Sequence, residues 1–307
     1  MKETIKYYYN IDVDNLEENN GKYHFRWQNR DFFFVFYNRN LEELEDILLC
    51  VQNMREKGIL VNDIFLNRNN SYLTKVNEYN YILMAVTNYD EIYDIFDIVN
   101  ITSKLKLNSQ SSKLYRNNWG NLWMQKVDYF EYQIRELGLN KIVTKDSFSY
   151  YIGLAENAIS YVNNSNFKYP RENVSVVLAH RRVFYPNYKL NFMNPLSFIF
   201  DLRVRDIAEY LKAMFFEVED TQEVLEDLKA YLKIQHLTYY EASMLYARLL
   251  YPSYYFDIYE DVMNNDRNEE DLVSIVSKCN SYELFLKEAY LEISKYAPIE
   301  KVDWLIN

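Results

Sequence analysis

The sequence predicts an α+β protein with two parts, a small antiparallel sheet and a larger, mainly helical region. Three observations support this prediction. The first 86 residues alternate short apolar runs, rich in aromatic and β-branched residues, with polar turns, which is typical of strands. One clear amphipathic helix interrupts these runs at residues 41–57. From residue 88 onward the apolar residues recur mainly at helical spacing.

The strands of the first part are marked by apolar runs between turn residues. Lys22 to Trp27 and Asp31 to Tyr37 are separated by Gln28-Asn29-Arg30, which predicts a hairpin. Further strands are expected at Ile64–Leu66, Tyr72–Thr74 and Tyr81–Val86, with one more near residues 5–11.

The helix at residues 41–57 carries signals at both ends. Asn40 can cap it, and Glu42 and Glu43 lie favourably in its first turn. Gly58 can end it. In the second part we expect helices at 89–106, 117–137, 146–163, 201–216, 221–233, 238–250, 254–264, 269–277 and 281–296, with short β-like runs at 174–178 and 196–200.

This order of elements is the layout of the two-lobed protein kinase-like fold. A small sheet-rich lobe with one long helix is followed by a larger, mainly helical lobe. We therefore expect a kinase-like N-lobe at residues 1–88 and a helical C-lobe at residues 89–307. Because one fold serves many functions, the layout by itself does not identify an activity.

Composition excludes several classes of function. The formal net charge of −11 argues against a nucleic-acid partner, because phosphate binding needs a concentrated basic face. The sequence contains no run of 18 apolar residues, so it predicts no transmembrane segment. The charged start, Met1 to Lys6, lacks the apolar core of a secretory signal, so we expect the protein to work where it is made. Cys50 and Cys279 form no disulfide or zinc pattern, and Cys50 is expected to be a buried, inert thiol.

Glycine is scarce, with only five isolated residues in the chain. Loops that bring the backbone close to a triphosphate need several glycines at short spacing. The sequence therefore excludes a Walker A loop, a Rossmann fingerprint and an ordinary kinase glycine loop.

Four stretches of the second part carry a more specific signal. They are Trp119–Trp123 with Tyr129–Ile134, Tyr150–Ile159, His180–Arg182 with Asn194–Pro195 and Phe198–Tyr210, and Leu245–Pro252. Together with the layout, they resemble the YutH branch of the CotS family of spore coat-associated proteins over nearly the whole chain. That family is related in fold to aminoglycoside and choline phosphotransferases, and its members are associated with the coat of bacterial endospores.

An active kinase-like phosphotransferase needs a lysine on one strand, paired with a glutamate on the following helix. The run Asp31–Tyr37, where the resemblance places this strand, contains no lysine. Arg30 and Arg39 flank the run and are expected to be solvated charges. Without the lysine, Glu43 and Glu45 are expected to be exposed helix carboxylates.

The catalytic loop that the resemblance implies is degenerate. The family pattern H-x-D-x(4)-N corresponds here to the run from His180 to Asn187, with Arg182 at the position of the aspartate base. Arginine cannot accept a proton from a substrate hydroxyl, and its charge disfavours magnesium nearby. We expect His180 to be structural.

The metal aspartate has two interpretations. Counting forward from Asn187 places Asp201 near the expected position. Asp206 looks like the start of the fold's Asp-Leu-Ala motif, and counting backward from it shows that Asp201 is too close to be the metal aspartate. The metal aspartate is then absent, and we favour this second count. Asp206 is then structural, accepting backbone N–H groups of the catalytic loop. We expect no metal site and no cofactor, and Asn187 and Asp201 are the candidates if a metal site exists.

Four arginines, Arg181, Arg182, Arg203 and Arg205, lie close in sequence to these carboxylates. They can form an internal network in which arginine replaces magnesium as the positive partner of Asp201 and Asp206. They can also form an anion or phosphopeptide site, or remain solvated. We favour the internal network.

The sequence thus predicts a catalytically degenerate kinase-like protein, a pseudokinase, which we do not expect to be an enzyme. The resemblance implies a structural or scaffolding role in spore coat assembly, with other spore coat proteins as partners. It also implies that the protein is made in the cytoplasm of the mother cell and ends on the spore coat. Two alternatives remain, a small-molecule phosphotransferase with an unconventional site and a binder of nucleotide or phosphate without turnover.

Overall fold

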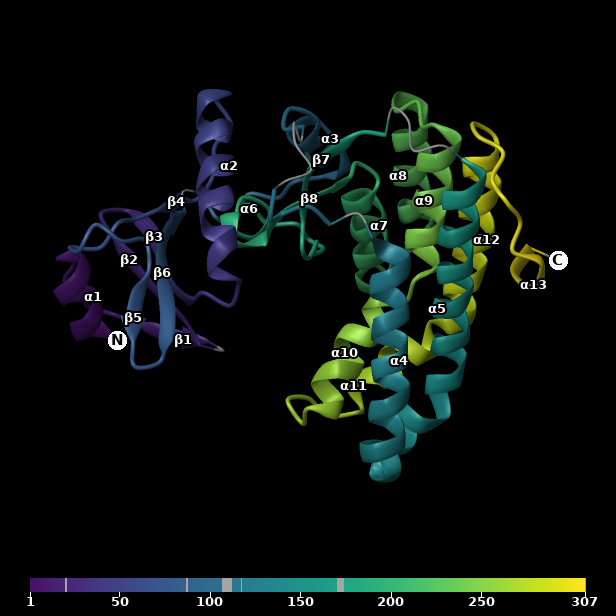
Figure 1. The fold of residues 1–307 in the computed structure, drawn as a ribbon, viewed down its shortest axis with the longest axis horizontal. Coiled ribbons are helices and arrows are strands. Elements are labelled where there is room, and N and C mark those ends of the chain that lie inside the picture. The colour runs from purple at the N-terminus through teal and green to yellow at the C-terminus, as the bar shows by residue number, and fades with distance from the viewer. Residues whose placement is uncertain (20, 87, 107–111, 117, 170–173, 307) are drawn as a thin grey trace. The chain divides into compact units, whose positions relative to one another are not determined.

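The computed structural model describes residues 1–19, 21–86, 88–106, 112–116, 118–169 and 174–306 (Figure 1). The chain forms two compact units. The sheet unit consists of Met1–Asp94, Leu107–Tyr115 and Pro186–Ile199, and the helical unit consists of Ile95–Lys106, Arg116–Tyr185 and Phe200–Asn307. No helix within the described ranges has both the length and the apolarity needed to cross a bilayer.

The sheet unit contains a late segment of the chain, Pro186–Ile199, in addition to the N-terminal residues. Backbone hydrogen bonds explain this, since Asn62 donates to the carbonyl of Met193 at 3.1 Å and Lys189 donates to that of Glu91 at 2.7 Å. This segment contains the helix α6 (Lys189–Phe192) and the 3-10 turn η3 (Pro195–Ser197). The division into lobes at residue 88 stays a prediction, because each compact unit is made of three separate segments of the chain.

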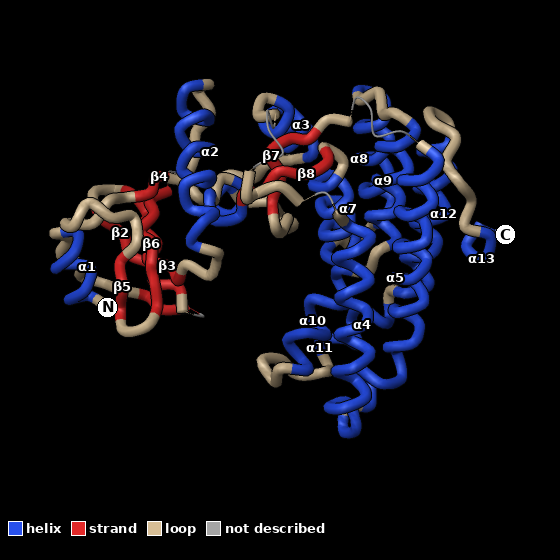
Figure 2. The backbone as a smooth tube through the Cα atoms, in the orientation of Figure 1, coloured by secondary structure: helices blue, strands red, loops and turns tan. Residues whose placement is uncertain are grey.

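The strands of the sheet unit form one antiparallel sheet (Figure 2). Its strand order is β1-β2-β3-β6-β4, and β5 also pairs with β6. The predicted hairpin is confirmed between β2 and β3, where Gln28 and Asn29 adopt φ values of 48° and 59°. The strand bounds are β1 Glu17–Asn19, β2 Lys22–Trp27, β3 Arg30–Phe36, β4 Asp63–Ile64, β5 Thr74–Val76 and β6 Tyr79–Val86.

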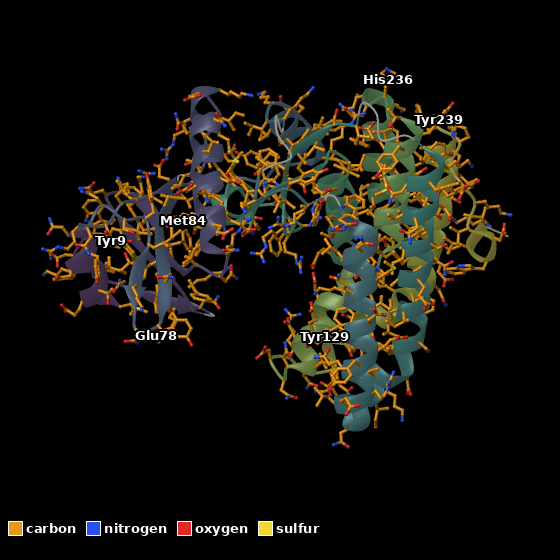
Figure 3. The ribbon with its side chains drawn as sticks, viewed as in Figure 1. Tyr9, Glu78, Met84, Tyr129, His236 and Tyr239 are labelled. Carbon is orange, nitrogen blue, oxygen red and sulfur yellow. The ribbon has the colours of Figure 1, made fainter. Side chains whose placement is uncertain are left out.

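One face of this sheet is covered by the N-terminal helix α1 (Lys2–Tyr9), whose Ile5 is fully buried against Phe34 and its neighbours. The Tyr9 hydroxyl, labelled in Figure 3, lies 2.7 Å from Thr74 Oγ1. The expectation of a strand near residues 5–11 is therefore wrong. Consecutive tyrosines favour a strand locally, but packing of one helical face onto the sheet outweighs that preference.

The predicted helix at 41–57 is confirmed as a 3-10 turn, η1 (Leu41–Glu43), that continues into α2 (Leu44–Glu56). Asn40 caps it as expected, because Asn40 Oδ1 accepts the N–H of Glu42 at 3.1 Å. Beyond its C-terminal end Gly58 adopts a φ of 69°. The face that packs inside the unit consists of Ile47, Cys50, Val51 and Met54.

The helical unit is built around α9 (Tyr239–Leu250), which is buried from Tyr240 to Leu250. A helix buried on all sides belongs to the centre of a bundle, and α9 packs on α5, α7 and α12. The other helices are α3 Ile95–Ser103, α4 Trp119–Leu137, α5 Ile142–Lys168, α7 Arg205–Glu217, α8 Thr221–Ile234, α10 Ser253–Met263, α11 Asp271–Ser277, α12 Cys279–Ser294 and α13 Asp303–Ile306, with the 3-10 turn η2 at Gly138–Asn140.

Two short strands, β7 (Val176–His180) and β8 (Phe198–Leu202), pair with each other. They match the β-like runs predicted at 174–178 and 196–200. The helix predicted at 201–216 begins too early, because Asp201 and Leu202 still belong to β8. Likewise α3 begins at Ile95 rather than at residue 89. The ends of these strands determine the positions of His180 and Asp201.

Candidate functional site

The degenerate catalytic loop begins at His180, the last residue of β7. Its backbone N–H donates to Asp206 Oδ1 at 3.0 Å, and its Nδ1 lies 2.6 Å from Asp206 Oδ2. Both side chains are buried, and Asp206 is in the first turn of α7. This geometry fits a structural role for Asp206, in which the carboxylate holds the start of the loop.

Asp201, near the end of β8, has a fully buried carboxylate. The indole N–H of Trp119 donates to both oxygens, at 3.1 and 2.9 Å. The N–H of Leu202 donates to Oδ1 at 2.7 Å, and Arg205 Nη1 donates to Oδ2 at 3.0 Å. Burial raises the pKa of Asp201, while the Arg205 and Arg248 guanidinium groups and the Trp119 hydrogen bond oppose this rise.

The Arg205 side chain links this carboxylate to the catalytic loop. Besides its bond to Asp201, its Nε donates to the carbonyl oxygen of His180 at 3.0 Å. Burial and the nearby Arg248 lower the pKa of Arg205, and the Asp201 carboxylate opposes this effect. The guanidinium therefore has its charge neutralised and two of its donors satisfied by the end of β8 and the end of β7.

A second group of charges lies beside this pair. Arg248 Nε and Lys212 Nζ lie 2.7 and 2.8 Å from Glu209 Oε1, and the Ser253 hydroxyl donates to Oε2 at 3.1 Å. The Arg248 guanidinium also lies over the Trp119 ring, 4.7 Å from its centroid. Burial by itself would raise the pKa of Glu209, but Lys212, Arg248 and then Arg205 together hold it below its ordinary value.

Arg182, at the position of the missing base, is more than half exposed and donates to Asp257 Oδ1 at 2.7 Å. Arg203 donates to both carboxylate oxygens of Glu241 at 2.7 Å. Among Arg182, Arg203 and Arg205, it is thus Arg205 that pairs with Asp201. Arg182 and Arg203 pair with carboxylates that the sequence did not point to.

The helix glutamate Glu43 has an ion partner, which corrects the sequence-based expectation. It is buried, and Arg39 Nε donates to its Oε2 at 2.7 Å. Arg39 Nη1 also donates to the carbonyl oxygens of Leu196 and Phe198 at 3.0 and 2.7 Å. Arg39 is therefore a buried structural cation and not a solvated charge. Glu45 is exposed, as expected.

Strand β3 itself carries aromatic residues where a lysine would be needed. The Phe33 ring stacks on His24 with centroids 4.7 Å apart, and His24 Nε2 lies 2.9 Å from Asp31 Oδ1. Arg30, also expected to be solvated, pairs with Asp63 of β4. These contacts engage the Asp31 carboxylate and one end of the Arg30 guanidinium, whereas Arg30 Nε is buried without a hydrogen-bond partner among the described residues.

Asn187 and Cys50 are the remaining residues that the sequence singled out. Asn187 is buried in the sheet unit, where its carbonyl accepts the N–H of Tyr93 at 2.9 Å and its Nδ2 has no hydrogen-bond partner among the described residues. Cys50 is buried as predicted, and burial raises the pKa of its thiol to about 12. His236, labelled in Figure 3, is exposed. Across the described ranges, no group of three His, Cys, Asp or Glu side chains is arranged to hold a metal ion.

The first prediction concerns the buried pair. Replacing Arg205 by Met leaves the Asp201 carboxylate buried without its ion partner, so the free energy of unfolding should fall by about 3–5 kcal/mol in urea denaturation. The matched control is Arg267→Met, which removes an exposed pair with Asp261 at 3.4 Å and should cost below about 1 kcal/mol. The double variant Asp201→Asn with Arg205→Met should recover part of the loss. If Arg205→Met and the control lose the same free energy of unfolding, Arg205 is not the buried ion partner of Asp201.

The second prediction concerns acid stability. Because the pKa of Glu209 is lower in the folded chain than its ordinary 4.5, the unfolded chain binds the proton first as the pH falls. The stabilisation is complete above the ordinary pKa and is lost below it. The variant Glu209→Gln should therefore lose less unfolding free energy than the parent between about pH 5 and pH 3. Glu226→Gln, which removes an exposed carboxylate paired with Lys229, is the control, and an unchanged slope for Glu209→Gln would refute this prediction.

Comparisons with known proteins agree with this architecture. The family described as "Spore coat putative kinase YutH" matches residues 2–289. "Endospore coat-associated protein YutH" of Bacillus subtilis is 28% identical over 212 residues, which span 61% of this chain and 61% of that protein.

Solved structures show the same fold at low sequence identity. An aminoglycoside phosphotransferase from Alicyclobacillus acidocaldarius has a TM-score of 0.66 at 9% identity, covering 92% of this chain and 93% of its own. An AMP-bound spectinomycin phosphotransferase has a TM-score of 0.61 at 11% identity, covering 94% and 96%. The predicted kinase-like fold is confirmed, and the chain belongs to the YutH family of spore coat putative kinases.

Proposed function

We propose that this chain is a catalytically degenerate member of its family that does not transfer phosphate and that serves as a structural or scaffolding protein of the spore coat. The observation that carries this proposal is the fully buried Asp201 carboxylate, whose oxygens are hydrogen-bonded within the chain. Its positive partner is Arg205 at 3.0 Å.

Magnesium does not fit this arrangement. The ion requires a near-octahedral shell of oxygen atoms at short distance and keeps several water molecules. Asp201 Oδ1 already accepts from Trp119 and Leu202, and Oδ2 accepts from Trp119 and Arg205. A cation would have to displace the Arg205 guanidinium, which also holds the carbonyl of His180.

The absence of a base in the loop supports the same proposal. Arg182 stands at the position of the base, and an arginine side chain cannot take a proton from an attacking hydroxyl. Its guanidinium is paired with Asp257 of α10. Gly21, which lies between β1 and β2 with a φ of 72°, is one isolated glycine and does not make a loop that lets the backbone surround phosphates.

The coat role rests on family membership and on the name of the Bacillus subtilis relative. We propose that this chain, too, is made in the cytoplasm of the mother cell and ends on the spore coat, with other coat proteins as its partners. A fold that keeps its shape through internal ion pairs needs no ligand to present a constant surface, which suits a scaffold.

A small-molecule phosphotransferase is the alternative. It is supported by the word kinase in the family description and by the phosphotransferases among the structural neighbours. A third possibility is a protein that binds nucleotide or phosphate without turnover. Nucleotide binding and its dependence on magnesium separate the three.

The third prediction tests phosphate transfer at its first step. Titration calorimetry of the purified chain with ATP at millimolar concentration should give no binding heat, with or without magnesium. Melting should not shift, because a ligand stabilises a protein only by binding its folded form.

The alternatives give different results in the same titration. Micromolar binding that strengthens with magnesium, and that Asp201→Asn abolishes, would overturn the proposal in favour of a phosphotransferase. Binding that does not depend on magnesium and is unaffected by Asp201→Asn would favour the binder.

The fourth prediction tests the coat role. A fluorescent fusion of this chain, produced in sporulating Bacillus subtilis that lacks its own YutH protein, should collect at the spore periphery. The variant Arg182→Ala should collect equally, because the proposed role does not use the catalytic loop. The control is a matching fusion of the Bacillus subtilis YutH protein in the same strain. If that control reaches the spore periphery while the fusion of this chain stays diffuse in the mother cell, the proposal is contradicted.

A further inference from the structure

A groove of about 560 Å³ runs along α2 in the sheet unit. We call it the α2 groove. Apolar side chains from three places meet there, namely Leu48, Leu49 and Val51 of α2, Ile64 of β4, and Tyr72. The polar residues that line it are Glu45, Gln52, Arg55 and Glu56.

The groove gives α2 a second apolar side. The helix already buries Ile47 and Met54 completely inside the sheet unit. A surface helix of this kind normally has a polar opposite face, yet Leu49 is 55% exposed and Leu48 is only partly buried. Exposed apolar side chains that line a depression are typical of a surface that binds another molecule.

The charges at the groove are unevenly satisfied. Among the described residues, neither Glu45 nor Glu56 makes an ion pair, and the Glu56 carboxylate accepts the side-chain amide of Gln52 at 2.8 Å. The one cation of the lining, Arg55, donates to Asp63 at 2.7 Å, and Asp63 also pairs with Arg30. Two carboxylates are therefore available to a cationic occupant.

The spacing of these carboxylates gives the geometry of that occupant. Glu45 and Glu56 are eleven residues apart, which is close to three full turns, so they lie on the same side of α2 about 16 Å apart. The apolar residues Leu48 and Leu49 lie between them along the helix axis. An occupant that runs along α2 would meet an acidic group near each end and an apolar surface in the middle.

We propose that the α2 groove docks an amphipathic helix of a partner protein, with an apolar stripe and two basic residues about eleven positions apart. This inference rests on the proposed scaffolding role and gives the chemistry of its partner. The acidic rim and the net charge of −11 disfavour an anionic membrane as the occupant.

The test uses the full chain and a synthetic peptide as the probe. The peptide is a labelled helix with leucines at positions i, i+3, i+4 and i+7 and lysines eleven positions apart, and its binding is followed by fluorescence anisotropy. We expect saturable binding that weakens with salt. Leu49→Ser, and separately Glu45→Lys combined with Glu56→Lys, should each weaken it by about tenfold or more.

Two controls make the result specific to the groove. Leu284→Ser removes a leucine of α12 that is 65% exposed, and it should leave peptide binding unchanged. A matched peptide with glutamates in place of the lysines should not bind. Each variant is first shown to melt at the temperature of the parent.

Three results would overturn the inference. The basic peptide does not bind, the acidic peptide binds as tightly as the basic one, or Leu284→Ser weakens peptide binding as much as Leu49→Ser does. Self-association of the chain that Leu49→Ser abolishes would identify a second copy as the occupant instead. No nucleotide is present in this assay, so a negative result refutes helix docking at the α2 groove and leaves the proposed lack of phosphate transfer untested. Magnesium-dependent ATP binding, in contrast, would refute the proposed lack of phosphate transfer and leave the groove untouched.

Discussion

A carboxylate that is removed from water must be neutralised and hydrogen-bonded by its surroundings, and Asp201 meets this requirement entirely within the chain. Trp119 donates to both of its oxygens, and Arg205 supplies the opposite charge at 3.0 Å. Because the same guanidinium holds the carbonyl of His180, this one ion pair connects β8, the start of α7 and the end of β7. The shape of the catalytic loop therefore depends on it.

The neighbouring charges extend the same principle. Asp206 holds the N–H and the ring of His180, and Glu209 gathers Lys212 and Arg248. In a working phosphotransferase, a carboxylate at the end of such a strand is available to a metal ion and becomes fully satisfied only when the metal and nucleotide bind. In our proposal the internal cation takes that place permanently. The loop then keeps its conformation in the absence of any ligand, at the expense of the chemistry.

Local sequence signals predicted the local structure well. The hairpin at Gln28 and Asn29 and the cap at Asn40 follow from side-chain properties that act over a few residues. Two of the failures come from distant contacts. The N-terminal helix forms because Ile5 packs on the sheet, and Arg39 is buried because it reaches carbonyl groups near residue 196. For the site, the sequence identified the loop and its missing base, but nothing in the spacing pointed to Trp119 as a donor.

The most direct test of the central claim is the NMR signal of the Trp119 indole N–H, one of only four tryptophan indoles in the chain. This proton lies in the hydrogen bond to Asp201, so its signal is sensitive to the state of that carboxylate. With millimolar Mn²⁺ and ATP, we predict that the signal keeps its position and line width, because Asp201 stays paired with Arg205. Selective broadening of this signal, absent in Asp201→Asn, would show a metal ion at the carboxylate and contradict the account.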